Sequence, residues 1–265
     1  MTDIVVSIED EIGIVRLNRP DRGNSVTPDV VRRMGEAVAE FAETDTVSAV
    51  VLTGTGTVFC AGADVREMND VYTAEGPDAL MSYLGDIWMP AVQATVRMLW
   101  NAPVPLVAAY NGAATAGGLD FGLACDVRIA SSRARFAESY VNLGMVPVAG
   151  GAYLLPSLIG SAAALRMLAT GEFISAERAL ALGMVSDVCE PEAVAERAVE
   201  LAREMTHGPS ATYASVKKIA RTTATSELDA ALRASLAANI ELIARPGVRA
   251  GIVAVMDRYS GGSKS

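Results

Sequence analysis

The stretch NGAATAGGLDFGLACD, residues 111–126, places small residues and two adjacent glycines just before one acid, Asp120, in an otherwise apolar run. Glycine and alanine leave room for another group to approach the backbone closely. An acid in such surroundings must be solvated, paired or used in chemistry. The stretch therefore predicts a close-packed turn, and Asp120 is the first candidate for a functional residue.

Strand and helix patterns alternate on both sides of this stretch. VPLVAAY precedes it and DVRIA overlaps its end; both are typical of buried strands, and a short helix is expected from Gly117. Upstream, residues 4–17 are typical of a hairpin. The other expected elements are a helix from the Thr27 cap and Pro28 to about Glu43, a buried strand SAVVLTG and a helix around 76–100. Repeated strand-then-helix order predicts an α/β fold with parallel strands.

The last quarter of the chain is expected to be helical throughout. Its pattern runs from about Glu192 to Tyr259, with breaks near Gly208-Pro209 and Pro246-Gly247. We therefore expect an α/β core at 1–191 and a helical C-terminal region at 192–265, with no disordered linker between them.

Composition narrows the classes of protein. A formal net charge of -9 over 265 residues argues against partners that need a large basic surface, namely nucleic acid and anionic membranes. The long uncharged stretches at 97–120 and 138–166 contain prolines and glycines, so neither can be one membrane-spanning helix. The N-terminus has no signal-peptide pattern. Cys60, Cys125 and Cys189 have no metal-ligand spacing, and reduced thiols in a cytoplasmic protein are expected.

The motifs of several enzyme classes do not occur in the sequence. There is no G-x-S-x-G elbow, P-loop or G-x-G-x-x-G after a strand, and the sole histidine, His207, lies in a polar helix break. Carboxylates, tyrosine and backbone amides remain. Two loops, 56–68 and NGAATAGG, each follow a strand and lead into an expected helix start, where free amides suit an oxyanion. Amides converging from both loops would stabilise an enolate; the alternative is that the small residues only permit close packing.

Six segments occur in the order and spacing of one family. They are IVRLNRPDRGNS, FCAGAD, NGAATAGGLDFGLACD, RFAESYVNLGMVP, GGAYLLPSLIG and GEFISAERALALGMVSDV. Through them the chain resembles the crotonase (enoyl-CoA hydratase/isomerase) family over residues 4–258. The resemblance implies a spiral of ββα turns with a helical C-terminal trimerisation region. It also implies an acyl-CoA substrate, with no cofactor beyond the CoA of that substrate, no metal, and a homotrimer or hexamer.

The resemblance also assigns roles to individual positions. The amides of Ala63 and Gly117 would form an oxyanion hole around the thioester oxygen. The backbone of Ala61, Ala63 and Val65 would line the adenine pocket, and Asp64 would help to shape that loop. Arg22 is a candidate for the CoA phosphates, or else a solvated surface charge.

Asp120 stands where hydratases of this family place their first catalytic glutamate, and the alternative is an acid that caps the helix. The second glutamate position is held by Tyr140. Glu138 lies two residues earlier and is not expected to replace it, and Val148, where other members carry an acid, cannot ionise. The resemblance therefore implies one carboxylate and one phenol at this site.

That pairing favours one reaction over another. Hydration needs a base for the water and a source for the α-proton, and a phenol of pKa about 10 is a poor base. Moving a double bond needs one base, so isomerisation with Asp120 as base is favoured. The alternatives are an acyl-CoA-binding protein with a decayed catalytic pair, and a thioester hydrolase or decarboxylase. Residues 70–100 are expected to wall the acyl pocket, with Met81, Trp88, Met89 and Met98 as apolar lining.

Overall fold

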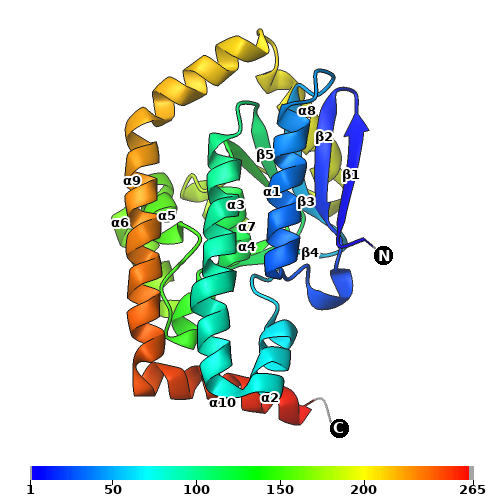
Figure 1. Cartoon of the computed structure of the whole chain (residues 1–265). Helices are drawn as coiled ribbons and strands as arrows, with labels where there is room; N and C mark the ends of the chain where they lie inside the picture. The colour runs from blue at the N-terminus through cyan, green and yellow to red at the C-terminus, as the bar shows by residue number, and fades with distance from the viewer. Residues whose placement is uncertain (1, 263–265) are drawn as a thin grey trace.

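The computed structural model describes residues 2–262, which form two β-sheets and a surrounding layer of helices (Figure 1). The larger sheet has six strands in the order β1-β2-β3-β5-β7-β10, and the smaller has four in the order β4-β6-β8-β9. The strands are β1 Ile4–Glu9, β2 Ile12–Leu17, β3 Ala49–Gly54, β4 Val58–Cys60, β5 Leu106–Tyr110, β6 Ala113–Thr115, β7 Val127–Ser131, β8 Arg135–Ala137, β9 Ile174–Ser175 and β10 Asp187–Cys189.

The expected hairpin and the expected parallel strands are both present. β1 pairs antiparallel with β2, with Ile4 opposite Leu17. From β2 onward the large sheet is parallel, through β3, β5, β7 and β10. The inner strand β3 is buried along its whole length. This burial explains its continuous apolar sequence, because a parallel sheet is covered on both faces.

The chain alternates between the two sheets. β3, β5 and β7 belong to the large sheet, and the strands that follow them, β4, β6 and β8, pair in parallel in the small sheet. Each pair of strands thus makes one turn of a spiral, and helices join successive turns. The predicted ββα spiral is confirmed.

The helices lie outside the sheets and include short 3-10 and π segments, labelled η. They are η1 Pro20–Arg22, α1 Pro28–Ala42, α2 Val65–Ser82, η2 Tyr83–Trp88, α3 Met89–Asn101, α4 Gly117–Leu123, η3 Ser139–Leu143, α5 Gly151–Ile159, α6 Ser161–Thr170, α7 Ala176–Ala181, η4 Pro191–Ala193, α8 Val194–Met205, α9 Ser210–Ala244 and α10 Pro246–Gly262. The Thr27 hydroxyl caps α1 by accepting the Val30 N–H at 3.2 Å, as the sequence predicts.

One helix prediction needs correction. The segment expected around 76–100 belongs to a longer helical stretch that starts at Val65, where the Asp64 carboxylate accepts the Arg66 N–H at 3.0 Å. At Gly76 the backbone turns to φ 86°, and Pro77 starts the next helical turn. The Gly-Pro pair therefore marks a kink inside the stretch rather than its beginning, because proline is tolerated in a first turn.

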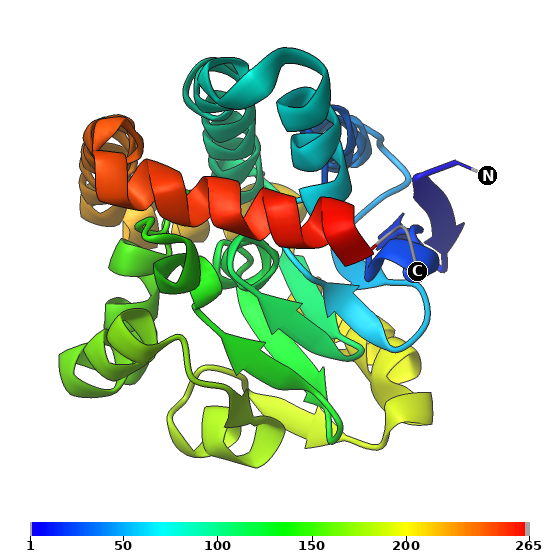
Figure 2. The same ribbon diagram turned by 90° about the horizontal axis from the view of Figure 1, so that it is seen from below.

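The C-terminal helices wrap around the spiral. α8 packs on one face of the large sheet through Val194, Ala198 and Ala202. The long helix α9 runs along one side of the molecule, and α10 crosses its underside over α4 and the small sheet (Figures 1 and 2). No helix within residues 2–262 is both long and apolar enough to cross a membrane.

Candidate active site

Three loops meet at one edge of the small sheet. β4 ends at Cys60, β6 at Thr115 and β8 at Ala137, and the three strands run parallel. The carboxyl ends of parallel strands lie at the same edge, which is the usual place for a ligand in an open α/β sheet. The loops that follow these strands carry the residues singled out in the sequence.

A largely apolar cavity of about 250 Å³ lies between these loops and the helices that cover them. From the loops, Ala61, Ala63, Gly117 and Tyr140 line it, and from α10 its lining includes Met256. The other lining side chains or backbone segments are Val65, Met68, Leu84, Trp88, Ala116, Ser139, Asn142, Leu143, Met145, Ile252 and Val255. Figure 2 shows α10 crossing this side of the molecule.

The expected acyl-pocket wall at residues 70–100 is only partly correct. Trp88 lines the cavity, together with Leu84. Met81 and Met89 are instead buried in the main hydrophobic core. The Met98 side chain packs near Gly35 on α1. These methionines therefore fill the interior, as Met does in many cores.

The two small-residue loops touch each other closely. A Cβ on Gly118 would overlap the Cys60 carbonyl, and one on Gly62 would lie 3.1 Å from the Thr115 carbonyl and 3.8 Å from the Gly117 nitrogen. The glycines therefore do permit close packing, which was the alternative reading of these loops. The same packing brings the Ala63 and Gly117 segments to one cavity.

The amides of Ala63 and Gly117 are not used elsewhere in the described backbone. Neither donates a hydrogen bond among the loop and cap contacts of residues 2–262. Gly117 is the first residue of α4, where an amide has no intrahelical acceptor. Ala116, immediately before it, has φ 49° and ψ -126°, a costly conformation for alanine. The backbone is therefore strained where it presents the Gly117 amide.

Asp120 and Tyr140 are brought together. The Tyr140 hydroxyl donates to Asp120 Oδ2 at 3.2 Å, and both residues are buried. The hydroxyl also lies 3.2 Å from the position that a Cβ on Gly117 would take. Tyr140 lines the cavity, whereas Asp120 is 0% exposed and lies one hydrogen bond behind the phenol.

Glu138 is the residue that the sequence reasoning missed. Its side chain is 0% exposed, and its carboxyl group lies beside that of Asp120. A Cβ on Gly151 would overlap Asp120 Oδ1 and lie 2.5 Å from Glu138 Oε1. The expectation of one carboxylate and one phenol is therefore wrong, because a second carboxyl group joins them. Val148 is buried and apolar, as its sequence implies.

Burial controls the protonation of all three groups. It raises the pKa of Asp120 from 3.8 to about 7, although hydrogen bonds from Glu138, Tyr140 and the Gly151 amide oppose the rise. Burial and the charge of Asp120 raise the pKa of Glu138 well above its usual range. Burial, Asp120 and Glu138 also raise the pKa of Tyr140. Asp120 is therefore the group of this cluster that titrates near neutral pH.

Asp64 joins the loop after β4 to the start of the chain. Its buried carboxylate pairs with Arg19 at 2.6 Å and with Arg22 at 3.2 Å, besides capping α2. Burial alone would raise the pKa of Asp64, but the two guanidinium groups lower it below its usual value. Arg19 was not predicted, and its position in the same RPDR segment as Arg22 was the available signal. The Arg22 side chain remains 41% exposed.

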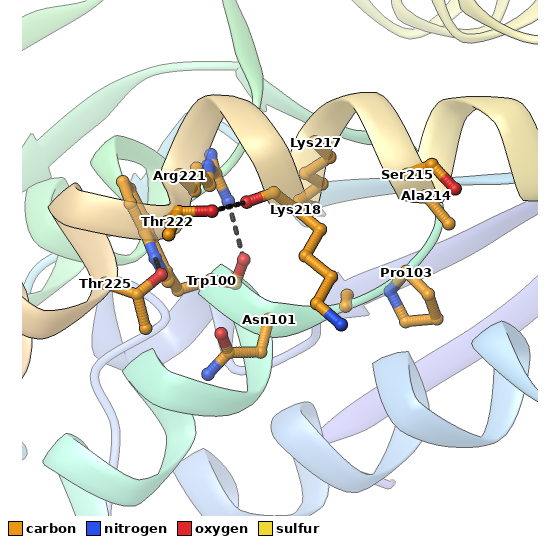
Figure 3. Close-up of a pocket in the computed structure, with 11 residues that line it drawn as sticks. Trp100, Asn101, Pro103, Ala214, Ser215, Lys217, Lys218, Arg221, Thr222 and Thr225 are labelled. Carbon is orange, nitrogen blue, oxygen red and sulfur yellow. Dashed lines mark hydrogen bonds between the residues drawn. The ribbon is translucent and has the colours of Figure 1, made fainter.

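A second hollow of about 530 Å³ lies between the end of α3 and the start of α9, away from these loops (Figure 3). Its cations are already engaged: Lys217 and Arg221 pair with Asp126 at 2.8 and 2.9 Å. The Arg221 guanidinium also stacks on the Trp100 ring at 3.7 Å. These contacts bind α9 to the spiral, and none of the predicted site residues lies here.

Other potential ligands are scattered. No group of three or more His, Cys, Asp or Glu side chains within the described chain is arranged to hold a metal ion. Cys60 and Cys125 are buried free thiols, whose pKa burial raises to about 12, and Cys189 is half-buried. His207 is exposed between α8 and α9. The polar groups described at the cavity are therefore backbone amides and the Tyr140 phenol, with the two buried carboxyl groups behind them.

Comparison with known proteins identifies the family of the chain. Residues 7–260 match the family model described as enoyl-CoA hydratase/isomerase. The chain is 34% identical to a short-chain-enoyl-CoA hydratase of Clostridium acetobutylicum, over 77% of this chain and 76% of that one. It is 33% identical to a 1,2-epoxyphenylacetyl-CoA isomerase of Escherichia coli, over 88% and 87%. An enoyl-CoA hydratase structure from Mycobacterium avium subsp. paratuberculosis superposes with TM-score 0.82 at 26% identity, covering 96% of this chain and 98% of that one.

The chain belongs to the crotonase (enoyl-CoA hydratase/isomerase) family. It is therefore an enzyme of the lyase or isomerase type that acts on acyl-CoA thioesters. Its relatives include both hydratases and isomerases.

Proposed function

We propose that this enzyme moves a double bond along the acyl chain of an enoyl-CoA, in preference to hydrating it, with Asp120 as the base. The observation that carries the proposal is the hydrogen bond from the cavity-lining Tyr140 hydroxyl to Asp120, next to Gly117. A base whose pKa lies near the working pH is efficient at both taking and returning a proton.

The proposed steps use one proton. Asp120 takes a proton from the α-carbon, and the C–H electron pair spreads into an enolate conjugated with the double bond. The amides of Ala63 and Gly117 hold the negative charge on the thioester oxygen. Asp120 then returns the proton to the γ-carbon, which places the double bond next to the thioester. Tyr140 orients the carboxylate and is not consumed.

The CoA part of the substrate is proposed to run along the loop after β4. The backbone of Ala61, Ala63 and Val65 lines the cavity and would hold the adenine. Asp64 fixes the loop, and the exposed side of Arg22 would meet a phosphate. No cofactor or metal beyond the CoA of the substrate is required by this mechanism.

The assembly is proposed to be a cytoplasmic homotrimer or hexamer built through the helical region from residue 192 onward. Two apolar side chains on α9 support this, because Val216 is 58% and Ile219 76% exposed. Sedimentation at micromolar concentration tests it, and a monomer there would contradict it.

A second candidate is an acyl-CoA-binding protein without turnover. The observation in its favour is that Asp120 is 0% exposed, with Tyr140 between it and the cavity. A substrate would have to displace the phenol, or pass its proton through it, to reach the base.

A panel of 2-enoyl- and 3-enoyl-CoA substrates in D₂O separates these functions. We expect α-deuteration and double-bond migration to be faster than hydration. Tight binding of acyl-CoA without deuteration would support the acyl-CoA-binding protein and contradict the enzyme. Hydration faster than double-bond migration would overturn the preference for isomerisation. Release of free CoA thiol would point to a hydrolase, and loss of CO₂ from an α-carboxylated acyl-CoA to a decarboxylase.

A further inference from the structure

Glu138 has no role in the proposed reaction, and its position needs explanation. It directly follows β8, and its carboxyl group is completely buried. Within residues 2–262, no N–H or hydroxyl group donates to either of its oxygens. A buried carboxylate without a donor would be very costly. Glu138 must therefore be stabilised in another form.

The neighbour that Glu138 contacts is Asp120. One oxygen of each carboxyl group faces Gly151, the first residue of α5, where only the absence of a Cβ leaves them room, and no other donor meets these two oxygens within residues 2–262. Two buried carboxyl groups that face each other in this way can form a hydrogen bond only when a proton lies between them. The pair therefore carries one proton and a single negative charge.

Among the described residues, no cation is paired with either acid that would allow both to ionise. Tyr140 on η3 donates a hydrogen bond to Asp120. Tyr110 on β5 is a buried phenol whose pKa is raised by burial and by the charges of both acids. Arg128 on β7 is the nearest basic side chain described among these interactions, and it bonds to the carbonyls of Cys125 and Met184 instead. Like charges in contact cannot both persist without such a partner.

The contacts of the two acids decide which one keeps the proton. Asp120 receives the Tyr140 hydroxyl and interacts with the Gly151 amide, so its anion is stabilised. No donor to Glu138 is described within residues 2–262, and burial and the charge of Asp120 raise its pKa well above its usual value. The negative charge therefore belongs to Asp120 and the proton to Glu138.

We propose that Glu138 is a positioning residue that stays a neutral carboxylic acid and donates its proton in a hydrogen bond to Asp120. Together with Tyr140 it gives the Asp120 carboxylate two O–H donors in a site without a cation. The role of this bond in catalysis rests on the proposed function of Asp120 as base; the protonation of Glu138 does not. Glu138 does not line the cavity and so is not expected to contact the substrate.

The test is a pair of substitutions with opposite expectations. Glu138→Gln keeps a neutral donor, so the pH at which α-deuteration rises should stay within about half a unit of the wild type. Glu138→Met keeps the size and loses the donor, so that rise should move to higher pH by about one unit or more, with about a tenfold slower rate at pH 7. Glu192→Gln, at an exposed glutamate, is the control.

An activity-independent measurement accompanies these profiles. The infrared C=O band of a protonated carboxylic acid should be present at pH 8 in the wild type and the control, and should disappear in Glu138→Gln. A band that persists in Glu138→Gln, or is absent from the wild type, overturns the proposal. So does a profile that Glu138→Gln moves to lower pH, because the variant would then have removed a charge. If the wild type and the control show the band but neither the wild type nor any variant deuterates the substrate, the role of Asp120 as base is contradicted and the protonation of Glu138 is not.

Discussion

Asp120 and Asp126 lie near opposite ends of α4, and the fold neutralises them in different ways. Asp126 is surrounded by positive groups: Lys217 at 2.8 Å, Arg221 at 2.9 Å and the Leu106 N–H at 2.7 Å. Asp120 is met by O–H groups, from Tyr140 and Glu138. Both carboxyl groups are shielded from water, since the Asp126 side chain is 9% exposed.

The different partners of Asp126 and Asp120 fit one acid for a structural role and the other for proton transfer. The Asp126 carboxylate pairs with two cations of α9 and ties that helix to the spiral, so removing it would leave both cations without their anion. Asp120 has no such cationic partner among its described contacts, and burial raises its pKa to about 7. A carboxyl group with a pKa near neutral is suited to accept and release a proton.

The largest expected effect is on turnover when Asp120 is changed. Asp120→Asn keeps the size but removes the base, so α-deuteration should fall about 100- to 10,000-fold with acyl-CoA affinity nearly unchanged. Exchange kinetics and calorimetric binding measure the two quantities. If Asp120→Asn retains exchange and Tyr140→Phe loses it, the base is the phenol.

Asp126→Asn should act on stability instead. It leaves Lys217 and Arg221 buried without their anion, so the free energy of unfolding should fall by about 3–5 kcal/mol. Urea unfolding at matched protein concentration measures this. The folded fraction should still turn over substrate, and a variant of wild-type stability would show that the cation cluster is not structural.

Gly151→Ala tests the narrow space above the two acids. The added methyl would overlap Asp120 Oδ1, so the pair must shift, and a displacement of about 1 Å at a catalytic group costs about 100-fold in rate. Gly251→Ala on α10 is the matched control, because nothing lies within 4 Å of its new Cβ. Equal rates for both variants would mean that the position of the pair does not matter.

The smallest expected effect is on stability as a function of pH. The folded-state pKa of Asp120, about 7, is above its ordinary value of 3.8, so folding favours the protonated form. That contribution is present below about pH 4 and is lost as pH rises through 7. Asp120→Asn should therefore gain about 2–3 kcal/mol, or about 5–10 °C in Tm, over the wild type between pH 5 and pH 8. A constant difference across that range would contradict the raised pKa.

Much of the fold could be predicted because its signals are local. Thr27 and Pro28 predict the start of α1, and the continuous apolar sequence at 49–54 predicts a strand buried on both faces. The helix expected around 76–100 was placed too late, because a Gly-Pro pair such as Gly76-Pro77 can begin a helix or interrupt one. Only the packing of the chain before Gly76 distinguishes these outcomes.

The acid pair could not be predicted for a different reason. Glu138 meets Asp120 because β8 ends at Ala137 and the chain turns into η3, so residues 138 and 140 approach Asp120 without the alternation of a strand. The room for the pair depends on Gly151, far along the sequence. Position-by-position comparison with the family pointed to Asp120 and Tyr140, and it assigned no role to Glu138.

Ala116 has a consequence for the dynamics of the cavity. Its φ of 49° would be cheaper for glycine, which adopts that region freely. A glycine there would also let the peptide before Gly117 rotate, and such rotations would turn the amide away from the cavity. The methyl group of Ala116 removes most of those alternative orientations. In the oxyanion hole proposed above, the Gly117 amide would therefore be oriented before a ligand arrives, and little entropy would be lost on binding.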